Sequence, residues 1–242
     1  MTADEVIHNP TGSGSKRERA KTHRVATRRR QIIDAATHLW QINGFHDTSV
    51  QAVADEAGIS VGLIYTYVKN KEDLLLLVIT DILEEYATEL PAAISRHDEV
   101  IGQLTEGFYV YCEIVDRRRQ AVVLAYRETK TLASAGQGII MAMEVETTNL
   151  FAELLRRGMT KGIFQEADEY LVAYDLILIA HAWALKHWFF GPRMSLEMYT
   201  AKQFSLLLRA ILATPEAITM SPAAAGRRLD QGRIRPVGDG AQ

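Results

Sequence analysis

Helix stop and start signals follow one another so closely between residues 43 and 71 that only short helices fit between them. Asn43-Gly44 supplies a left-handed stop after an amphipathic helix predicted over residues 24–42. Thr48 is placed to cap a second short helix, which Gly58 ends. This spacing predicts a compact group of short helices and leaves no room for the alternating pattern of a sheet.

Further helix start and stop signals follow the Ala57–Ser60 turn. Ser60 is placed to cap a third helix over residues 61–68. Asn70, with Asp73 at the third helical position, begins a fourth helix that is expected to stop at Pro91. Two short helices joined by a tight turn and flanked by longer ones form a helix-turn-helix arrangement.

The remainder of the chain has helical periodicity almost throughout, so the predicted fold class is all-α. Further helices are expected over residues 97–116, 118–133, 137–161, 167–190 and 195–213. The expected organisation is a disordered basic arm over 1–22, a DNA-binding domain over 23–72, an effector-binding and dimerisation domain over 73–214, and a disordered tail over 215–242.

Charge is distributed unevenly along the chain. The formal net charge of −3, from 27 Lys and Arg against 30 Asp and Glu, excludes a protein that coats nucleic acid over its whole surface. Residues 16–30 nevertheless hold eight positive side chains against one negative, a local charge of +7. This basic segment either contacts DNA or serves as a solubility tail, and its place beside a helix-turn-helix favours DNA contact.

Several classes of protein are disfavoured by what the sequence lacks. A single cysteine, Cys112, excludes an internal disulfide and fits a cytoplasmic location. Residues 171–190 are apolar enough to suggest a membrane span, but they contain Asp175, His181 and Lys186, so no membrane association is expected. The common hydrolase, metalloprotease and nucleotide-binding motifs are missing, so we expect neither an enzyme nor a metal or other cofactor.

The run from Arg29 to Leu75 resembles the DNA-binding domain of the tetracycline-repressor (TetR) family. The resemblance rests on Gly44-Phe45, Thr48, Val53-Ala54, Ala57-Gly58-Ile59-Ser60, Tyr65 and Lys71, while Tyr67 and Val68 stand where the family commonly has His and Phe. It implies a homodimeric repressor that binds a palindromic double-stranded DNA operator and is released by a small effector. The alternative is a helical lipid-binding or interaction module without sequence-specific DNA binding.

A recognition helix in the major groove presents its first residues to the bases and its flanks to phosphates. Tyr65 could instead pack on Trp40, and Lys71 could be a solvated residue at a helix start. The predicted DNA-binding residues are Thr48, Ser60, Val61, Gly62, Leu63, Tyr65, Thr66, Tyr67 and Lys71, of which Val61, Gly62, Leu63 and Thr66 are expected nearest the bases.

The last two helices are those that pair across the dimer in the family. The first of them is apolar nearly all round, so one face needs a partner beyond the local core, although burial within one chain is the alternative. The predicted interface residues are Trp183, Trp188, Phe204 and Leu208.

The effector site is predicted among aromatic and sulfur-containing side chains, most of which could equally be ordinary core. A guanidinium at Arg127 needs an anionic partner, either an internal Glu or the effector. The run YRETKTL resembles family members that respond to acyl-coenzyme A esters, which implies a lipophilic thioester. The predicted effector-binding residues are Phe108, Tyr109, Cys112, Tyr126, Arg127 and Met141.

Overall fold

The computed structural model describes residues 13–213, with side chains described from residue 21 onward. The chain divides into two compact units between Leu74 and Leu75, close to the domain boundary expected after residue 72. The predictions for residues 1–12 and for the tail from 215 onward lie outside the described residues.

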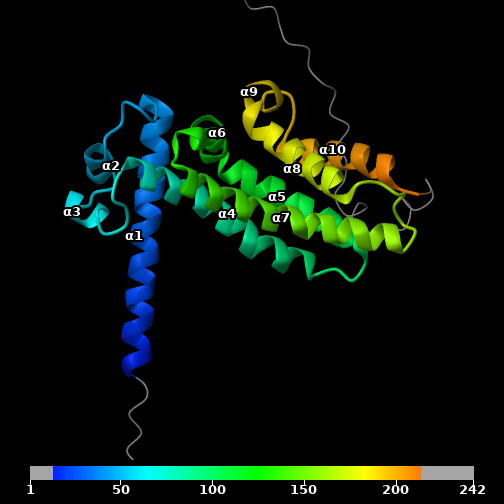
Figure 1. Ribbon diagram of the computed structural model, residues 1–242, viewed down its shortest axis with the longest axis horizontal. Coiled ribbons are helices and arrows are strands. Elements are labelled where there is room, and N and C mark those ends of the chain that lie inside the picture. The colour runs from blue at the N-terminus through cyan, green and yellow to red at the C-terminus, as the bar shows by residue number, and fades with distance from the viewer. Residues whose placement is uncertain (1–12, 214–242) are drawn as a thin grey trace, which may run out of the picture. The chain divides into compact units, whose positions relative to one another are not determined.

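The first unit is the predicted group of short helices around one long helix (Figure 1). Ile32 and Ala36 of the long helix are fully buried, as its apolar stripe predicts, and Trp40 packs edge-on against Phe45 at 5.2 Å between ring centroids. Its helices are α1 (Ser13–Asn43), α2 (Val50–Glu56), α3 (Val61–Ile64) and the first residues of α4 (Lys71–Ile94).

Three of the predicted helix boundaries in this unit are confirmed by local backbone and capping geometry. Gly44 follows α1 with φ of 82°, a conformation that glycine adopts without strain. The Ser60 hydroxyl accepts a hydrogen bond from the amide of Leu63 at 3.3 Å. At the start of α4, the Asn70 side chain accepts from the Asp73 amide at 2.7 Å.

The predicted cap of α2 is wrong. Ser49, rather than Thr48, is the N-cap, and its hydroxyl accepts from the Ala52 amide at 3.1 Å. Thr48 is 2% exposed, and its hydroxyl donates to the Gly44 carbonyl at 2.8 Å. The cap falls to Ser49 because this residue, and not its neighbour, takes the extended backbone next to the first helical residue.

Three helices that begin in the first unit, α1, α3 and α4, differ in length from their predictions. α1 begins at Ser13 and not at residue 24, so residues 13–22 are helical where a mobile arm was expected. Arg, Lys, Ala and Glu are strong helix formers, and extending an existing helix costs less than nucleating one. α3 ends at Ile64, and a turn occupies the remainder of the segment predicted to be helical through residue 68.

Pro91 does not end α4, which continues to Ile94. A proline in a helix removes one backbone hydrogen bond. Here the extension buries Ala93, which is 1% exposed, and this apolar burial offsets part of that cost.

The second unit is a helical bundle in which α8 contacts α5, α6, α7 and α10. In Figure 1, α5, α7 and α8 lie alongside one another. Between residues 13 and 213, strand-like pairing is confined to one isolated antiparallel bridge, Phe164 with Leu212. The helices of this unit are the rest of α4, α5 (Val100–Arg117), α6 (Arg119–Glu128), η1 (Thr129–Thr131), α7 (Ser134–Thr160), α8 (Glu169–Leu185), α9 (His187–Phe190) and α10 (Leu196–Ile211).

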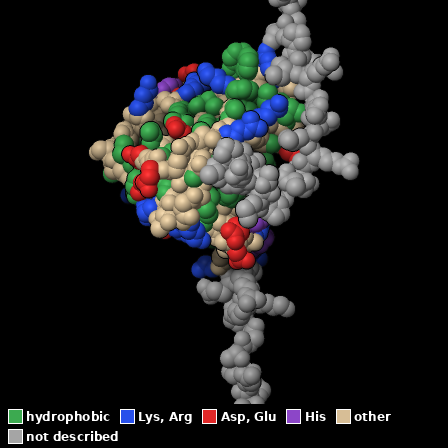
Figure 2. Space-filling model, turned by 90° about the vertical axis from the view of Figure 1, so that its right-hand side faces the viewer, with side chains coloured by type: hydrophobic (Ala, Val, Ile, Leu, Met, Phe, Trp, Pro, Cys, Tyr) green, Lys and Arg blue, Asp and Glu red, His purple; other side chains and the backbone are tan. Residues whose placement is uncertain are grey.

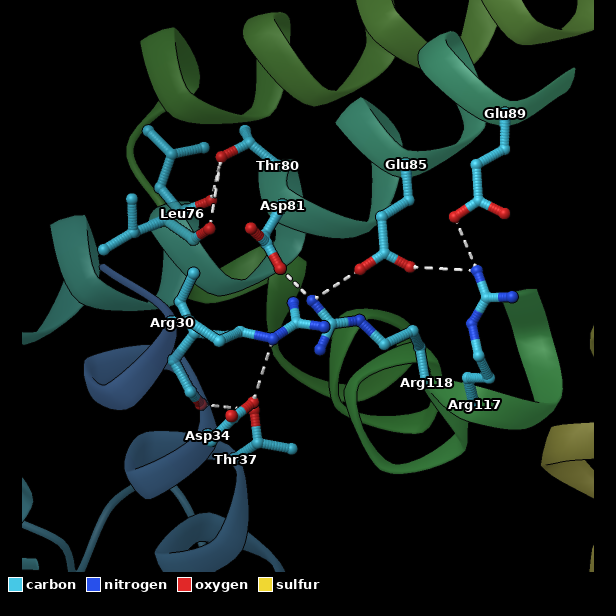
Figure 3. A network of polar contacts seen from close by, with 12 residues as sticks. Arg30, Asp34, Thr37, Leu76, Thr80, Asp81, Glu85, Glu89, Arg117 and Arg118 are labelled. Atoms are coloured by element: carbon cyan, nitrogen blue, oxygen red, sulfur yellow. Dashed lines mark hydrogen bonds and ion pairs between the residues drawn. The ribbon is translucent and has the colours of Figure 1, made fainter. Parts of the chain in front are cut away.

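Ion pairs join α4 to the corner between α5 and α6. Figure 3 shows Arg118 directed toward Asp81 and Glu85, and Arg117 toward Glu89. The Arg118–Glu85 distance is 3.0 Å and the Arg117–Glu89 distance is 2.6 Å. Asp81 and Arg118 have side chains only 8% and 10% exposed, so removing either partner would leave a largely buried charge. The network therefore joins α4 to the corner between α5 and α6.

Apolar side chains also reach that surface. Figure 2 shows hydrophobic groups among charged ones on one face of the molecule. In the second unit Leu171, Leu178, Trp188 and Leu206 are more than half exposed. None of the helices within the described part of the chain is long and apolar enough to cross a bilayer.

Candidate DNA interface and effector cavity

The start of α3 presents a small, accessible surface. Gly62 is exposed, and Val61 and Leu63 are half-buried, so their outer atoms remain available for contact. Ile64 is 0% exposed and anchors the helix in the core. An exposed helix start anchored from behind is the geometry that a major-groove reader needs.

The following turn carries three hydroxyls: Tyr65 and Thr66 are exposed and Tyr67 is half-buried. Tyr65 is 52% exposed and does not form the ring contact with Trp40 that was considered as an alternative, because Trp40 packs against Phe45 instead. Thr66 is exposed, but its hydroxyl donates to the Leu63 carbonyl at 2.7 Å. That hydroxyl can still accept hydrogen bonds, whereas its hydrogen is already used.

Lys71 supports the local structure as well as the predicted DNA surface. Its Nζ donates to the carbonyls of His46 and Thr48 at 2.8 and 3.1 Å, and it lies 4.7 Å from the Phe45 ring centroid. An ammonium has three hydrogens, so one remains for an external acceptor such as a phosphate. Lys71 is thus neither a freely solvated residue nor a phosphate contact alone. Thr48, by contrast, is buried and not placed to contact a phosphate.

The second unit contains a cavity of about 300 Å³, lined by residues of α4, α5, α6, η1, α7 and α8. The walls are largely apolar and include Ile79, Ile82 and Ile177. Tyr126 and Met141 line it and are 51% and 58% exposed, so they mark its open side. Small-molecule sites are typically apolar hollows of this kind with a few placed polar groups.

The polar groups of the cavity centre on His181 of α8. Its Nε2 lies 2.9 Å from the Tyr111 hydroxyl, and its Nδ1 lies 2.9 Å from the Tyr126 hydroxyl. Burial lowers the pKa of His181 to about 4, so the ring is neutral near pH 7. Tyr86 stacks on Tyr111 at 4.3 Å between ring centroids, and burial raises the pKa of both phenols. Glu144 also lines the cavity, and partial burial raises its pKa.

Only two of the predicted effector residues, Tyr126 and Met141, line this cavity. Phe108 and Cys112 are 1% and 0% exposed and belong to the core, where Phe108 stacks on Phe204 at 5.4 Å. Tyr109 likewise packs edge-on against Phe204, at 6.4 Å. Phe108, Tyr109 and Cys112 lie on the face of α5 that packs toward α10, whereas the cavity lies on its other face. Helical periodicity alone does not indicate which face of α5 lines the cavity.

Arg127 lies at the surface beside an internal Glu, the first of the two partners considered for it. Its side chain is 68% exposed, and its Nε lies 3.9 Å from a carboxylate oxygen of Glu128. An exposed guanidinium is hydrated by solvent and does not need an effector to satisfy it. The prediction missed the main polar residues of the cavity, Tyr86, Tyr111 and His181. The one sequence signal that could have located this polar group was His181, a histidine in the strongly apolar segment 171–190.

Two of the predicted interface residues are buried within a single chain. Trp183 is 3% exposed and donates from Nε1 to the Asp116 carboxylate at 2.7 Å, and Phe204 is 5% exposed. Neither is available to a partner, because the local core already uses the face that carries them. Trp188 is 72% exposed and Leu208 is half-buried, so both remain accessible.

Family models match both units of the chain. Residues 32–78 match the model described as bacterial regulatory proteins of the tetR family. Residues 97–211 match the model described as a tetracyclin repressor-like C-terminal domain.

Individual relatives agree with these matches. The chain is 36% identical over 197 residues to the HTH-type transcriptional regulator HbdR of Aromatoleum sp. (strain CIB), covering 81% of this chain and 86% of that one. It is 41% identical over 138 residues to the fatty acid metabolism regulator protein of Bacillus subtilis (strain 168), covering 57% and 63%. The solved structure of AibR in complex with isovaleryl coenzyme A and operator DNA has a similar fold, with a TM-score of 0.63 at 17% identity over 77% of this chain and 98% of that one.

Proposed function

We propose a repressor function for this chain, which belongs to the TetR family of bacterial transcriptional regulators. It would bind a palindromic operator as a homodimer and be released from it by an acyl-coenzyme A. The observation that carries the DNA-binding part is the exposed start of α3, anchored by the buried Ile64. Val61, Gly62, Leu63 and Thr66 would meet base edges, while Ser60, Tyr65, Tyr67 and Lys71 would meet phosphates.

The homodimer is proposed from the apolar surface of the second unit. Trp188, Leu171 and Leu206 are 72%, 63% and 65% exposed, an unfavourable exposure for a lone chain. A two-fold partner would cover these groups and place two α3 helices on half-sites about one helical turn apart.

The effector class is supported by the cavity and by one structural neighbour. AibR is solved in complex with isovaleryl coenzyme A, and the cavity of this chain offers apolar walls for an acyl group. Its volume of about 300 Å³ lies at the lower end of the usual range for ligand pockets, which favours an acyl group shorter than a long-chain fatty acid. Arg127 is next to Tyr126 in the chain and exposed, so it would contact the phosphates of the coenzyme outside the cavity.

Release would operate through α4. This helix begins in the first unit and supplies Ile79, Ile82 and Tyr86 to the cavity in the second. A ligand that favours a different position of α4 would change the separation of the two α3 helices. The required coupling, about 1–3 kcal/mol, is the usual size for such regulators.

Titrated gel shifts on the promoter region of the protein's own gene test this proposal. We expect sequence-selective, salt-sensitive binding that acyl-coenzyme A esters weaken, and an Arg127→Ala variant that binds DNA normally but responds to them less. If the protein binds acyl thioesters but no DNA selectively, the alternative of a lipid-binding module is correct. If DNA is bound and no thioester releases it, the effector class is wrong.

A further inference from the structure

One polar atom in the cavity wall, the hydroxyl oxygen of Tyr86, is buried beside the Tyr111 hydroxyl but forms no hydrogen bond of normal geometry with it or with any other described residue. Tyr86 is 2% exposed and lines the cavity from α4. Burial raises the pKa of Tyr86, so the hydroxyl keeps its hydrogen. Buried hydroxyls nearly always have a partner, since leaving one unpaired is destabilising. A partner that arrives with a ligand would explain this exception.

The hydrogen bonds between His181 and its two tyrosines leave a second hydroxyl hydrogen without an acceptor. A neutral imidazole has one N–H and one bare nitrogen, so His181 donates to one of its two tyrosines and accepts from the other. The tyrosine that accepts from His181 keeps its own hydroxyl hydrogen. Whichever tautomer is present, Tyr111 or Tyr126 therefore has a hydrogen to offer in addition to that of Tyr86.

Three other hydroxyls of the cavity wall use their hydrogens within their own helices, and none of these three is hydrogen-bonded to Tyr86. Thr129, Thr147 and Thr148 donate to backbone carbonyls at 2.7, 3.2 and 2.8 Å. Within the described residues, the one charged side chain in the lining is Glu144, which is acidic. The cavity thus has spare hydrogen-bond donors and no cation.

We propose that this cavity selects an acyl group bearing a neutral oxygen, such as a hydroxyl, toward its buried end, with Tyr86 donating a hydrogen bond to that oxygen. The inference rests on the proposed function and names the part of the effector that enters the cavity. A plain alkyl chain would leave the Tyr86 hydroxyl unpaired. A free carboxylate would be placed near Glu144 with no cation to balance it.

The test measures calorimetric affinities of the full chain for butyryl, hexanoyl and octanoyl coenzyme A, each with and without a terminal hydroxyl. For at least one chain length we expect the hydroxylated ester to bind about three- to tenfold more tightly, the ratio that one net hydrogen bond gives. Tyr86→Phe should reduce this ratio to about one, because the oxygen of the hydroxylated ester loses its donor.

Tyr199→Phe is the matched control. Tyr199 is 1% exposed, but its hydroxyl donates to the Ile179 carbonyl at 2.6 Å and does not line the cavity. This variant should keep the preference for the hydroxylated ester. Without ligand, Tyr86→Phe should melt at the same temperature as the parent or higher, because it removes an unpaired hydroxyl, whereas Tyr199→Phe should melt lower.

The outcomes separate the inference from the proposed function beneath it. Plain esters that bind and release DNA as well as hydroxylated ones would overturn the inference alone. A preference that survives Tyr86→Phe would also overturn it. If no thioester of either kind binds, the proposed effector class fails and the inference fails with it, while DNA binding is judged separately by the gel shift.

Discussion

Acidification should destabilise the second unit through His181, because its ring is neutral in the folded chain and becomes protonated on unfolding. Burial lowers its folded-state pKa to about 4, against about 6.5 in an unfolded chain. As the pH falls below about 6.5, the unfolded state binds a proton that the folded state excludes. The stability that depends on the neutral ring is therefore fully present above about pH 6.5 and is lost as the pH falls toward 4.

The magnitude follows from the two pKa values. Each unit of difference corresponds to about 1.4 kcal/mol, so the full loss by about pH 4 is roughly 3 kcal/mol. Between about pH 7 and pH 5 the loss is roughly 2 kcal/mol. Because the His181 side chain is not completely enclosed, we expect a measured loss of about 1–2 kcal/mol over that interval.

Urea unfolding followed by tryptophan fluorescence measures this change. A Trp40→Phe background restricts the signal to Trp183 and Trp188 of the second unit. His181→Gln retains a neutral donor and acceptor but cannot gain a proton. Between about pH 7 and pH 5, its free energy of unfolding should therefore fall by about 1–2 kcal/mol less than that of the parent. His46→Gln, at an exposed position in the first unit, is the control. An unchanged pH dependence in His181→Gln would refute the reasoning.

Three further substitutions test other parts of the structure. Lys71→Ala should destabilise the first unit by about 1–3 kcal/mol, because two carbonyls lose their charged donor, and should lower the salt dependence of DNA binding by about one unit for all sequences alike; unchanged urea unfolding would contradict the structural role. Trp188→Glu should give monomers on size-exclusion chromatography and abolish operator binding, and a monomer that still binds the full operator would contradict the dimer. Gly158→Ala should cost about 1–3 kcal/mol in thermal unfolding, since its new methyl would lie 2.1 Å from the Phe164 ring, whereas Gly138→Ala, with open space around it, should be neutral or stabilising.

Local signals were sufficient to predict the DNA-binding unit. The left-handed turn at Gly44 and the caps at Ser60 and Asn70 depend on backbone chemistry within a few residues, so the sequence alone locates them. Thr48 shows the limit of this reasoning. Either of two adjacent hydroxyl residues could cap α2; Ser49 does so, while Thr48 is buried and donates to the Gly44 carbonyl.

The second unit was predictable as helices but not as a site. Phe108 and Tyr126 have similar chemistry, yet one faces α10 in the core and the other lines the cavity. Periodicity identifies that a helix face is apolar, but not which neighbour covers it. For the same reason Trp183 was assigned to a partner chain, although Asp116 lies 67 residues earlier in the sequence and accepts its indole hydrogen bond within the same chain.

Tyr86 shows why the selective part of the cavity needed the structure. In sequence it is one more aromatic residue on the apolar face of α4, where phenylalanine would pack equally well. Its hydroxyl adds little to the folding of the unliganded chain, because it is buried and forms no hydrogen bond of normal geometry among the described residues. On the proposal above, a tyrosine in place of a phenylalanine has its rationale in the bound state, where the effector's oxygen accepts its hydrogen bond. The absence of a partner for one atom, rather than any residue pattern, is therefore the feature that points to an oxygen on the ligand.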